Sequence, residues 1–258
     1  MKKLIVLALA LILCVPIASY AASIGGAETQ GKGKLAIGLD QEFVFDRDME
    51  WDGANWELDP DEEIKDVEID KIYRTMVKTS YGVLDNLDIY VKLGVADFDG
   101  EGKSYESDVY QGKFEYKGKN AFAYGFGLKG AYPLQNDWLL GADLQYLRHK
   151  NKYSGKWISA DPADPEETWT GKATIQEWQV APYIAKKLGN FVPYFGVKYS
   201  DLRAKTKDNE GDYEKYKADD NFGVFLGTDY KITENWKLNL EGRFIDETAM
   251  SFGATYKF

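Results

Sequence analysis

The chain has 258 residues, of which 15% are aromatic, and a formal net charge of −10 at pH 7. So acidic a surface lacks the basic footprint that nucleic-acid partners require, and we expect no such partner. The single cysteine, Cys14, lies in the leader described next, so the rest of the chain is expected to form neither disulfides nor a thiol site.

The first residues have the three-part plan of a secretory signal peptide. Lys2 and Lys3 precede twelve apolar residues, 4–15, and Pro16 then breaks the run. The run is too short to cross a bilayer as a helix, which needs about 20 residues. Ser19 and Ala21 provide small residues at positions −3 and −1 of a cleavage site after Ala21, with Ala22 as the near alternative. We therefore predict a signal peptide over residues 1–21, with the remaining chain exported.

About 237 residues remain, with a mean hydropathy of −0.45 over the whole chain and no segment apolar enough for a transmembrane helix. We expect residues 22–33 to be an N-terminal periplasmic segment. Beyond it, apolar and polar residues alternate, as where Trp236 and Leu238 flank Lys237 and precede Asn239. Period two is typical of strands, because successive side chains point to opposite faces.

The alternation predicts ten strands, within a range of eight to twelve. Their expected ranges are 34–46, 67–81, 86–97, 119–132, 137–150, 172–187, 191–205, 221–232, 236–246 and 248–258. Short turns alternate with long polar loops, expected at 47–66, 98–118, 151–171 and 206–220, and a last tight turn is expected around residues 246–247. A secreted β-sandwich also alternates, but its long loops would not fall at every second connection. The sequence therefore predicts an all-β fold: a closed, antiparallel, up-and-down transmembrane barrel over residues 34–258.

One acidic stretch has the spacing of a calcium-binding loop. Asp97, Asp99, Glu101 and Asp108 stand at loop positions 1, 3, 5 and 12, with Gly102 at position 6. Position 12 is Asp rather than Glu, and flanking helices are not expected. A solvated acidic loop is the alternative. No other metal site and no cofactor are predicted.

The lone histidine, His149, is placed by the pattern at the outer end of a strand. Ten-stranded omptin proteases use an Asp-x-His pair at that height, but the residue two before His149 is Leu147. We therefore expect a histidine at the barrel rim without a catalytic role.

The end of the chain carries a pattern seen in a known group of proteins. Phe252, Ala254, Tyr256 and Phe258 alternate up to the terminus. This resembles the assembly signal of the bacterial outer-membrane β-barrel superfamily, and the chain is similar to its small single-chain barrels, of the OmpA-like and opacity-like kind. The resemblance implies that Phe252, Tyr256 and Phe258 form a barrel-assembly signal read by the barrel-assembly machinery, and that the chain resides in the bacterial outer membrane.

The charges on the face opposite the apolar one have mixed signs, and ten strands lie near the size that side chains fill. We therefore expect a non-enzymatic protein with a structural role or a narrow, porin-like role for small solutes. The alternative is an adhesin or ligand-binding barrel that acts through its long acidic loops. Outer-membrane lipid and lipopolysaccharide are the expected surroundings, and an extracellular partner would be unidentified.

Overall fold

A computed structural model describes residues 23–258; the predicted signal peptide and both cleavage positions lie outside them. The described chain is one antiparallel sheet of thirteen strands. The strands are β1 (Leu35–Ala54), β2 (Glu62–Leu84), β3 (Leu87–Ala96), β4 (Asp99–Glu106), β5 (Val109–Gly118), β6 (Ala121–Pro133), β7 (Trp138–Ser159), β8 (Glu167–Lys186), β9 (Phe191–Asp208), β10 (Tyr213–Ala218), β11 (Phe222–Lys231), β12 (Trp236–Phe244) and β13 (Thr248–Lys257).

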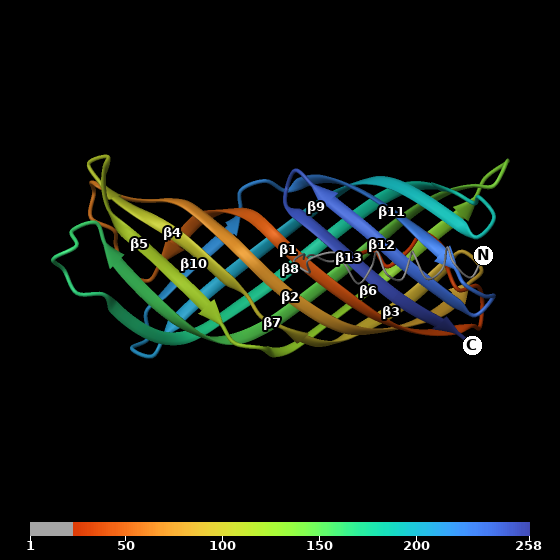
Figure 1. Cartoon of the computed structure of the whole chain (residues 1–258), viewed down its shortest axis with the longest axis horizontal. Coiled ribbons are helices and arrows are strands. Elements are labelled where there is room, and N and C mark those ends of the chain that lie inside the picture. The colour runs from red at the N-terminus through yellow and green to blue at the C-terminus, as the bar shows by residue number, and fades with distance from the viewer. Residues whose placement is uncertain (1–22) are drawn as a thin grey trace, which may run out of the picture.

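The strand pairings close two rings that share five strands. The ten-strand circuit runs β1–β2–β3–β6–β7–β8–β9–β11–β12–β13 and returns to β1. The eight-strand circuit runs β1–β2–β4–β5–β7–β8–β9–β10 and also returns to β1. Figure 1 shows β4, β5 and β10 at one end of an elongated molecule and the C-terminus near the other. Every described strand thus has at least two neighbours, and the predicted closed antiparallel barrel is confirmed.

The structure has thirteen strands where the sequence predicted ten, because segments interpreted as loops are strands. The stretch 98–118 holds β4 and β5, and 206–220 holds β10. The stretches 47–66 and 151–171 are mostly the continuations of β1, β2, β7 and β8. The connections that remain between these long strands are residues 55–61 and 160–166.

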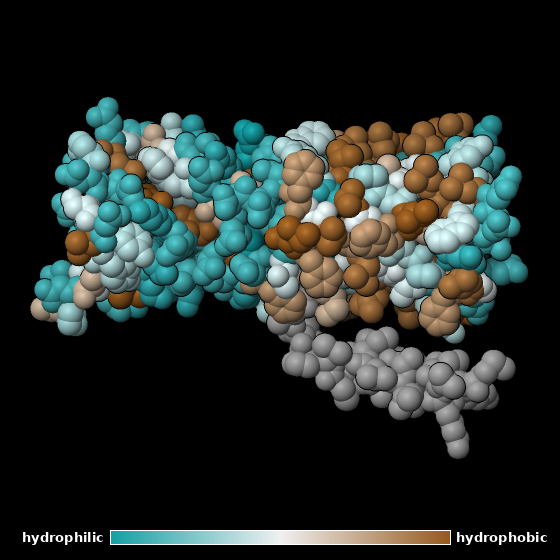
Figure 2. All heavy atoms as spheres, turned by 90° about the horizontal axis from the view of Figure 1, so that it is seen from above, coloured by the Kyte–Doolittle hydropathy of each residue, from teal (hydrophilic) through white to brown (hydrophobic). Residues whose placement is uncertain are grey.

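The polarity of the strands reverses part-way along, and this reversal explains the error. In the ten-strand circuit, apolar side chains such as Leu140 and Leu144 of β7 point outward and are exposed. Further along the same strand Lys150 and Lys152 point outward, while Tyr153 is buried inside. Figure 2 shows the result: apolar residues cover one half of the length and polar residues cover the other. The described residues contain no helix long and apolar enough to span a membrane.

The main hydrophobic core lies inside the eight-strand circuit. It contains Val67, Ile69, Phe98, Phe114, Tyr116, Tyr153, Ile175 and Tyr216, among others. Aromatic rings there pack over glycines of neighbouring strands: a Cβ built on Gly155 would lie 2.2 Å from Trp169 Cε2, and one on Gly102 2.3 Å from Phe114 Cζ. Glycine at these positions leaves room for the ring, so the interior fills without a wide opening.

Candidate functional site in the barrel lumen

The interior of the ten-strand circuit is a charged lumen. All but one of the charged side chains predicted to face inward are buried there, with Lys231 half-buried at one end. The buried ones are Asp40, Glu42, Arg74, Lys78, Lys92, Lys129, Asp143, Glu177, Lys198, Asp229, Glu241 and Arg243. Buried charges of both signs are tolerated only where they pair, so the arrangement of these ions decides what the lumen does.

Glu177 of β8 lies at the centre of one ion network. Its Oε1 accepts hydrogen bonds from Arg47 Nη1 at 2.9 Å and Ser200 Oγ at 2.7 Å. Its Oε2 accepts one from Arg74 Nη1 at 3.2 Å. Sequence reasoning placed Arg47 in a polar loop, but β1 continues through it and turns its side chain inward. One carboxylate therefore joins four strands across the lumen: β1, β2, β8 and β9.

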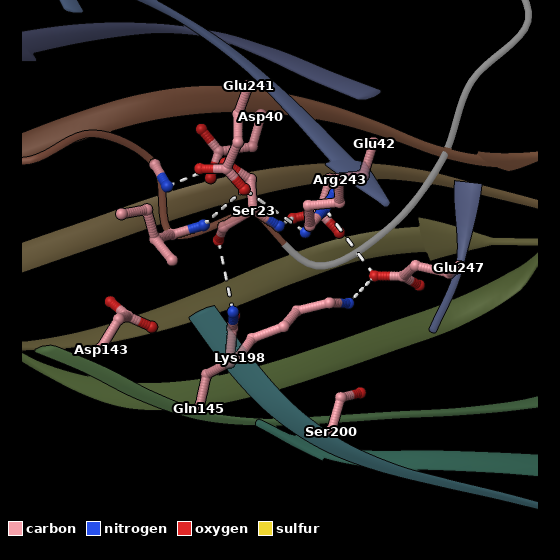
Figure 3. Close-up of polar contacts among 12 residues, drawn as sticks. Ser23, Asp40, Glu42, Asp143, Gln145, Lys198, Ser200, Glu241, Arg243 and Glu247 are labelled. Carbon is pink, nitrogen blue, oxygen red and sulfur yellow. Dashed lines mark hydrogen bonds and ion pairs between the residues drawn. The ribbon is translucent and has the colours of Figure 1, made fainter. Parts of the chain in front are cut away.

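The turn between β12 and β13 adds a second network. The sequence predicted a tight turn there, and the structure directs both of its acids into the lumen, where they are buried. Lys198 Nζ lies 2.9 Å from Asp246 Oδ2 and also pairs with Glu247, and Figure 3 shows Lys198 reaching toward Glu247. The preceding Ile245 has φ of 87°, a strained conformation for a β-branched residue, and it lies next to these buried ion pairs.

Residues 23–30, here called the lumen segment, enter the ten-strand circuit. Ser23 N donates to Glu42 Oε1 at 2.9 Å, and Lys92 Nζ donates to Ser23 O at 2.9 Å. Figure 3 shows Ser23 among the lumen side chains. Further along, Ala27 N donates to Asp229 Oδ2 at 3.0 Å. The sequence predicted a periplasmic segment over residues 22–33; its first described residues lie inside the barrel, and its periplasmic location stays a prediction.

Two features of the lumen segment fit it to this place. Gly26 has φ of 98°, and a Cβ there would lie 2.5 Å from Asp229 Oδ1, so only glycine fits. Ile24 and Ala27 are fully buried among side chains of β7, β8, β9 and β11. No alternation marks these residues in the sequence, but the pair Gly25-Gly26 beside one isoleucine was the available signal.

The eight-strand circuit is closed by side chains. The hydroxyls of Tyr116 and Tyr216 both donate to Glu214 Oε2, at 2.6 and 2.7 Å. Burial, reinforced by the nearby Glu214 carboxylate, raises the pKa of Tyr116 well above its usual value, so this hydroxyl stays a donor. A cavity of about 30 Å³, lined by Met49 and Ile175 among others, remains beside them. That volume is about the share of one water molecule.

His149 lies where the two circuits separate. It is 2% exposed, so it faces the interior rather than the rim expected from the sequence. Its Nδ1 lies 2.6 Å from Asn151 Oδ1, and Asn151 Nδ2 donates to the carbonyls of Ala96 and Lys119. These two carbonyls end β3 and precede β6, so the pair fastens the branch point of the sheet.

The residues of the predicted calcium loop do not converge. Asp99 pairs with Lys71 at 2.7 Å, and Asp108, at a hairpin turn, lies 3.4 Å from Lys65 Nζ. Asp97 accepts a hydrogen bond from Tyr73 N, and Glu101 points outward from β4. A strand spreads these carboxylates where a calcium loop would gather them. Calcium binding by this set stays a prediction.

A different cluster of acidic side chains lies on the outer surface of β2 and β4. Glu101 carboxylate oxygens approach those of Glu68 and Asp70. Burial, followed by repulsion from neighbouring carboxylates, raises the pKa of Glu68 and of Asp70. Cross-strand neighbours bring these acids together, which spacing along the sequence does not reveal.

Two residues of the predicted assembly signal, Phe252 and Tyr256, lie on β13, and the exposed Phe258 follows its end. Phe252 packs against Phe43 at a ring distance of 5.7 Å, and Tyr256 lies between Trp236 and Phe258 at 5.1 and 4.9 Å. Their role in assembly stays a prediction.

No curated protein matches the sequence. Solved structures that it resembles include the outer membrane protease OmpT from Escherichia coli, with 13% identity, 88% of this chain and 96% of that chain covered, and a TM-score of 0.49. Others are the translocator domain of autotransporter NalP from Neisseria meningitidis (12% identity, 90% of each chain, TM-score 0.44) and OprG from Pseudomonas aeruginosa (11%, 92% and 99%, TM-score 0.35). Residues 85–258 match the family described as outer membrane protein beta-barrel domain, and the chain belongs to that family.

Proposed function

We propose that this protein is a non-enzymatic, structural outer-membrane barrel that is closed to solutes. The ten-strand circuit crosses the bilayer, and the eight-strand circuit projects outside the cell as a rigid extension. The observation that carries the proposal is the filled interior: the aromatic core occupies the extension, and the lumen segment occupies the membrane part. A signal peptide cleaved after Ala21 or Ala22 would leave the lumen segment at the new N-terminus.

The surroundings of the one histidine support a non-enzymatic role. His149 is buried at the branch point and bonded to Asn151, beneath the aromatic core. The aromatic core of the extension lies between this ring and the outer end of the barrel, which supports the exclusion of an extracellular substrate. The alternative role as an adhesin would rest on the connections 55–61 and 160–166 and the hairpin tips, since the stretches predicted as long loops are strands.

A narrow conduit for small solutes is the second candidate, and the charged lumen favours it. Arg243 Nη2, Asp246 Oδ1 and both amide atoms of Gln179 are buried with neither a hydrogen bond nor an ion pair in the described part of the chain. Buried polar atoms of this kind require water, so a hydrated path through the membrane part is physically reasonable.

Conductance in planar bilayers separates the two candidates. The closed barrel predicts no discrete current steps from the mature protein, and none after deletion of residues 23–30, because the aromatic core remains in place. The conduit predicts steps from the mature protein and larger ones after the deletion. Heat-modifiable migration in SDS gels is the control that both proteins are folded. Discrete steps from the folded mature protein would overturn the closed-barrel proposal.

A further inference from the structure

The outward face of the extension carries a wall of basic side chains on one side. Cross-strand partners on β7, β8, β9 and β10 form three rows of four residues. The rows are Arg148–Gln176–Arg203–Lys217, Lys150–Thr174–Lys205–Lys215, and Lys152–Lys172–Lys207–Tyr213. Nine of these twelve positions are Lys or Arg and none is acidic. We call the nine cationic residues the basic wall.

The basic wall is poorly neutralised by the protein. In the third row, Lys152, Lys172 and Lys207 are direct cross-strand neighbours, and like charges in such positions repel. Arg203 pairs with Asp201, and Lys217 pairs with Glu50, both at 3.1 Å.

The other seven members form no ion pair within residues 23–258; they are Arg148, Lys150, Lys152, Lys172, Lys205, Lys207 and Lys215. In a chain with a net charge of −10, these cations remain concentrated and open to an anionic partner.

The position of the wall identifies that partner. Just below the first row, Tyr146 and Trp178 face each other with ring centroids 4.8 Å apart. Aromatic girdles of this kind mark the membrane interface. Arg148 lies two residues beyond Tyr146, or about 7 Å along the strand, so the first two rows lie at the depth of lipid headgroups.

The strands β1 and β2, of which β1 pairs with β10 at the edge of the wall, carry the opposite charge. Beyond the apolar band, the outward positions of β1 and β2 hold Asp46, Asp48, Glu68 and Asp70. The outward face of β7–β10 is therefore basic at this level, whereas that of β1 and β2 is acidic. A generally basic surface would not be one-sided, whereas a site for anionic headgroups beside one part of the barrel would be.

We propose that the basic wall binds the phosphate groups of lipopolysaccharide in the outer leaflet. Lys and Arg make charge-assisted hydrogen bonds to phosphate oxygens, and they accumulate next to membranes where anionic headgroups lie. Tyr146 and Trp178 contact the lipid directly below. A soluble polyanion would need the cations but not their place beside the apolar band.

The test compares binding of purified lipopolysaccharide to the folded barrel in phosphatidylcholine vesicles. The probe variant is Arg148→Gln/Lys150→Gln/Lys205→Gln, which removes three of the four unpaired cations of the first two rows. The matched control is Lys65→Gln/Lys103→Gln/Lys113→Gln, which removes three outward lysines that are ion-paired with acids elsewhere on the extension. Three interfacial charges predict a loss of affinity of roughly 100-fold in the probe variant, with less than a threefold change in the control.

Two further measurements test whether binding depends on the phosphate groups and on positive charge. Dephosphorylated lipopolysaccharide should bind the parent as weakly as intact lipopolysaccharide binds the probe variant, and Lys150→Arg/Lys205→Arg should keep parental affinity. Heat-modifiable migration confirms that each variant folds. Equal affinity of the parent and the probe variant would overturn the proposal. So would binding of soluble polyphosphate as tight as that of lipopolysaccharide, because it would assign the wall to a soluble partner.

Discussion

Gly155→Ala tests the packing of aromatic rings on glycines in the extension. The added Cβ would lie 2.2 Å from Trp169 Cε2. An ordinary carbon–carbon contact is about 3.6 Å, so the indole must move by roughly 1.4 Å. That ring meets Tyr116 edge-on at 6.0 Å, so the shift disturbs the core. We expect a loss of about 1–3 kcal/mol in the free energy of unfolding, as for overpacked cores.

Urea titration in detergent micelles, followed by tryptophan emission, measures this loss. The matched control is Gly130→Ala, also on a strand, where the nearest atom to a new Cβ is Asn86 O at 3.8 Å. The control should change stability by less than about 0.5 kcal/mol. In a double-mutant cycle with Trp169→Leu, part of the Gly155→Ala loss should disappear, because the smaller side chain leaves room. A Gly155→Ala protein as stable as the parent would refute the reasoning.

Three other predictions concern the lumen, the acidic surface and the chain end. Glu177→Gln should lower unfolding stability by about 3 kcal/mol in the same titration, because Arg47 and Arg74 lose a shared buried partner; no loss would mean that the network is dispensable. For Asp70, burial raises the pKa above 3.8, so its stabilising contribution exists at low pH and is lost as the pH rises through the raised pKa. Asp70→Asn should therefore reduce the fall in stability above about pH 4, and an unchanged pH profile would contradict this. Phe258→Ala should lower the amount of protein in outer-membrane fractions on immunoblots, and an unchanged amount would count against the assembly signal.

The membrane part of the fold could be predicted because its chemistry is uniform. Every membrane strand places apolar side chains toward hydrocarbon and polar side chains toward the lumen. The alternation in segments such as 236–244 was therefore sufficient to predict a strand. In the stretch 69–81 the alternation is irregular, because Ile72 and Met76 share the inward face with Arg74. A hydrophobic residue can face the lumen where it packs against other side chains. The sequence pattern alone does not distinguish such a residue from one that faces lipid.

The strands of the extension were not predicted because their apolar side chains face inward and their polar side chains outward, the reverse of the membrane strands. Phe114 and Tyr116 face inward and Lys113 and Glu115 outward, which is the alternation of a water-exposed barrel. The period was present in the sequence, but its apolar phase was opposite to that of the membrane strands. The inward position of the lumen charges could be predicted from the alternation. The placement of the lumen segment and the burial of Asp246 could not, because both depend on tertiary packing.

The five strands shared by both circuits connect the membrane part to the extension without a flexible linker. From Tyr146 to Ser159, β7 continues for thirteen residues past the aromatic girdle. At about 3.3 Å per residue and a tilt near 40°, this raises the strand end by roughly 30 Å. With the extension outside the cell, as proposed above, the exposed connection 160–166 would stand well clear of the membrane. A peptide epitope inserted between Pro162 and Pro165 would be held there in a fixed orientation, which makes this barrel suitable for displaying antigens on living cells.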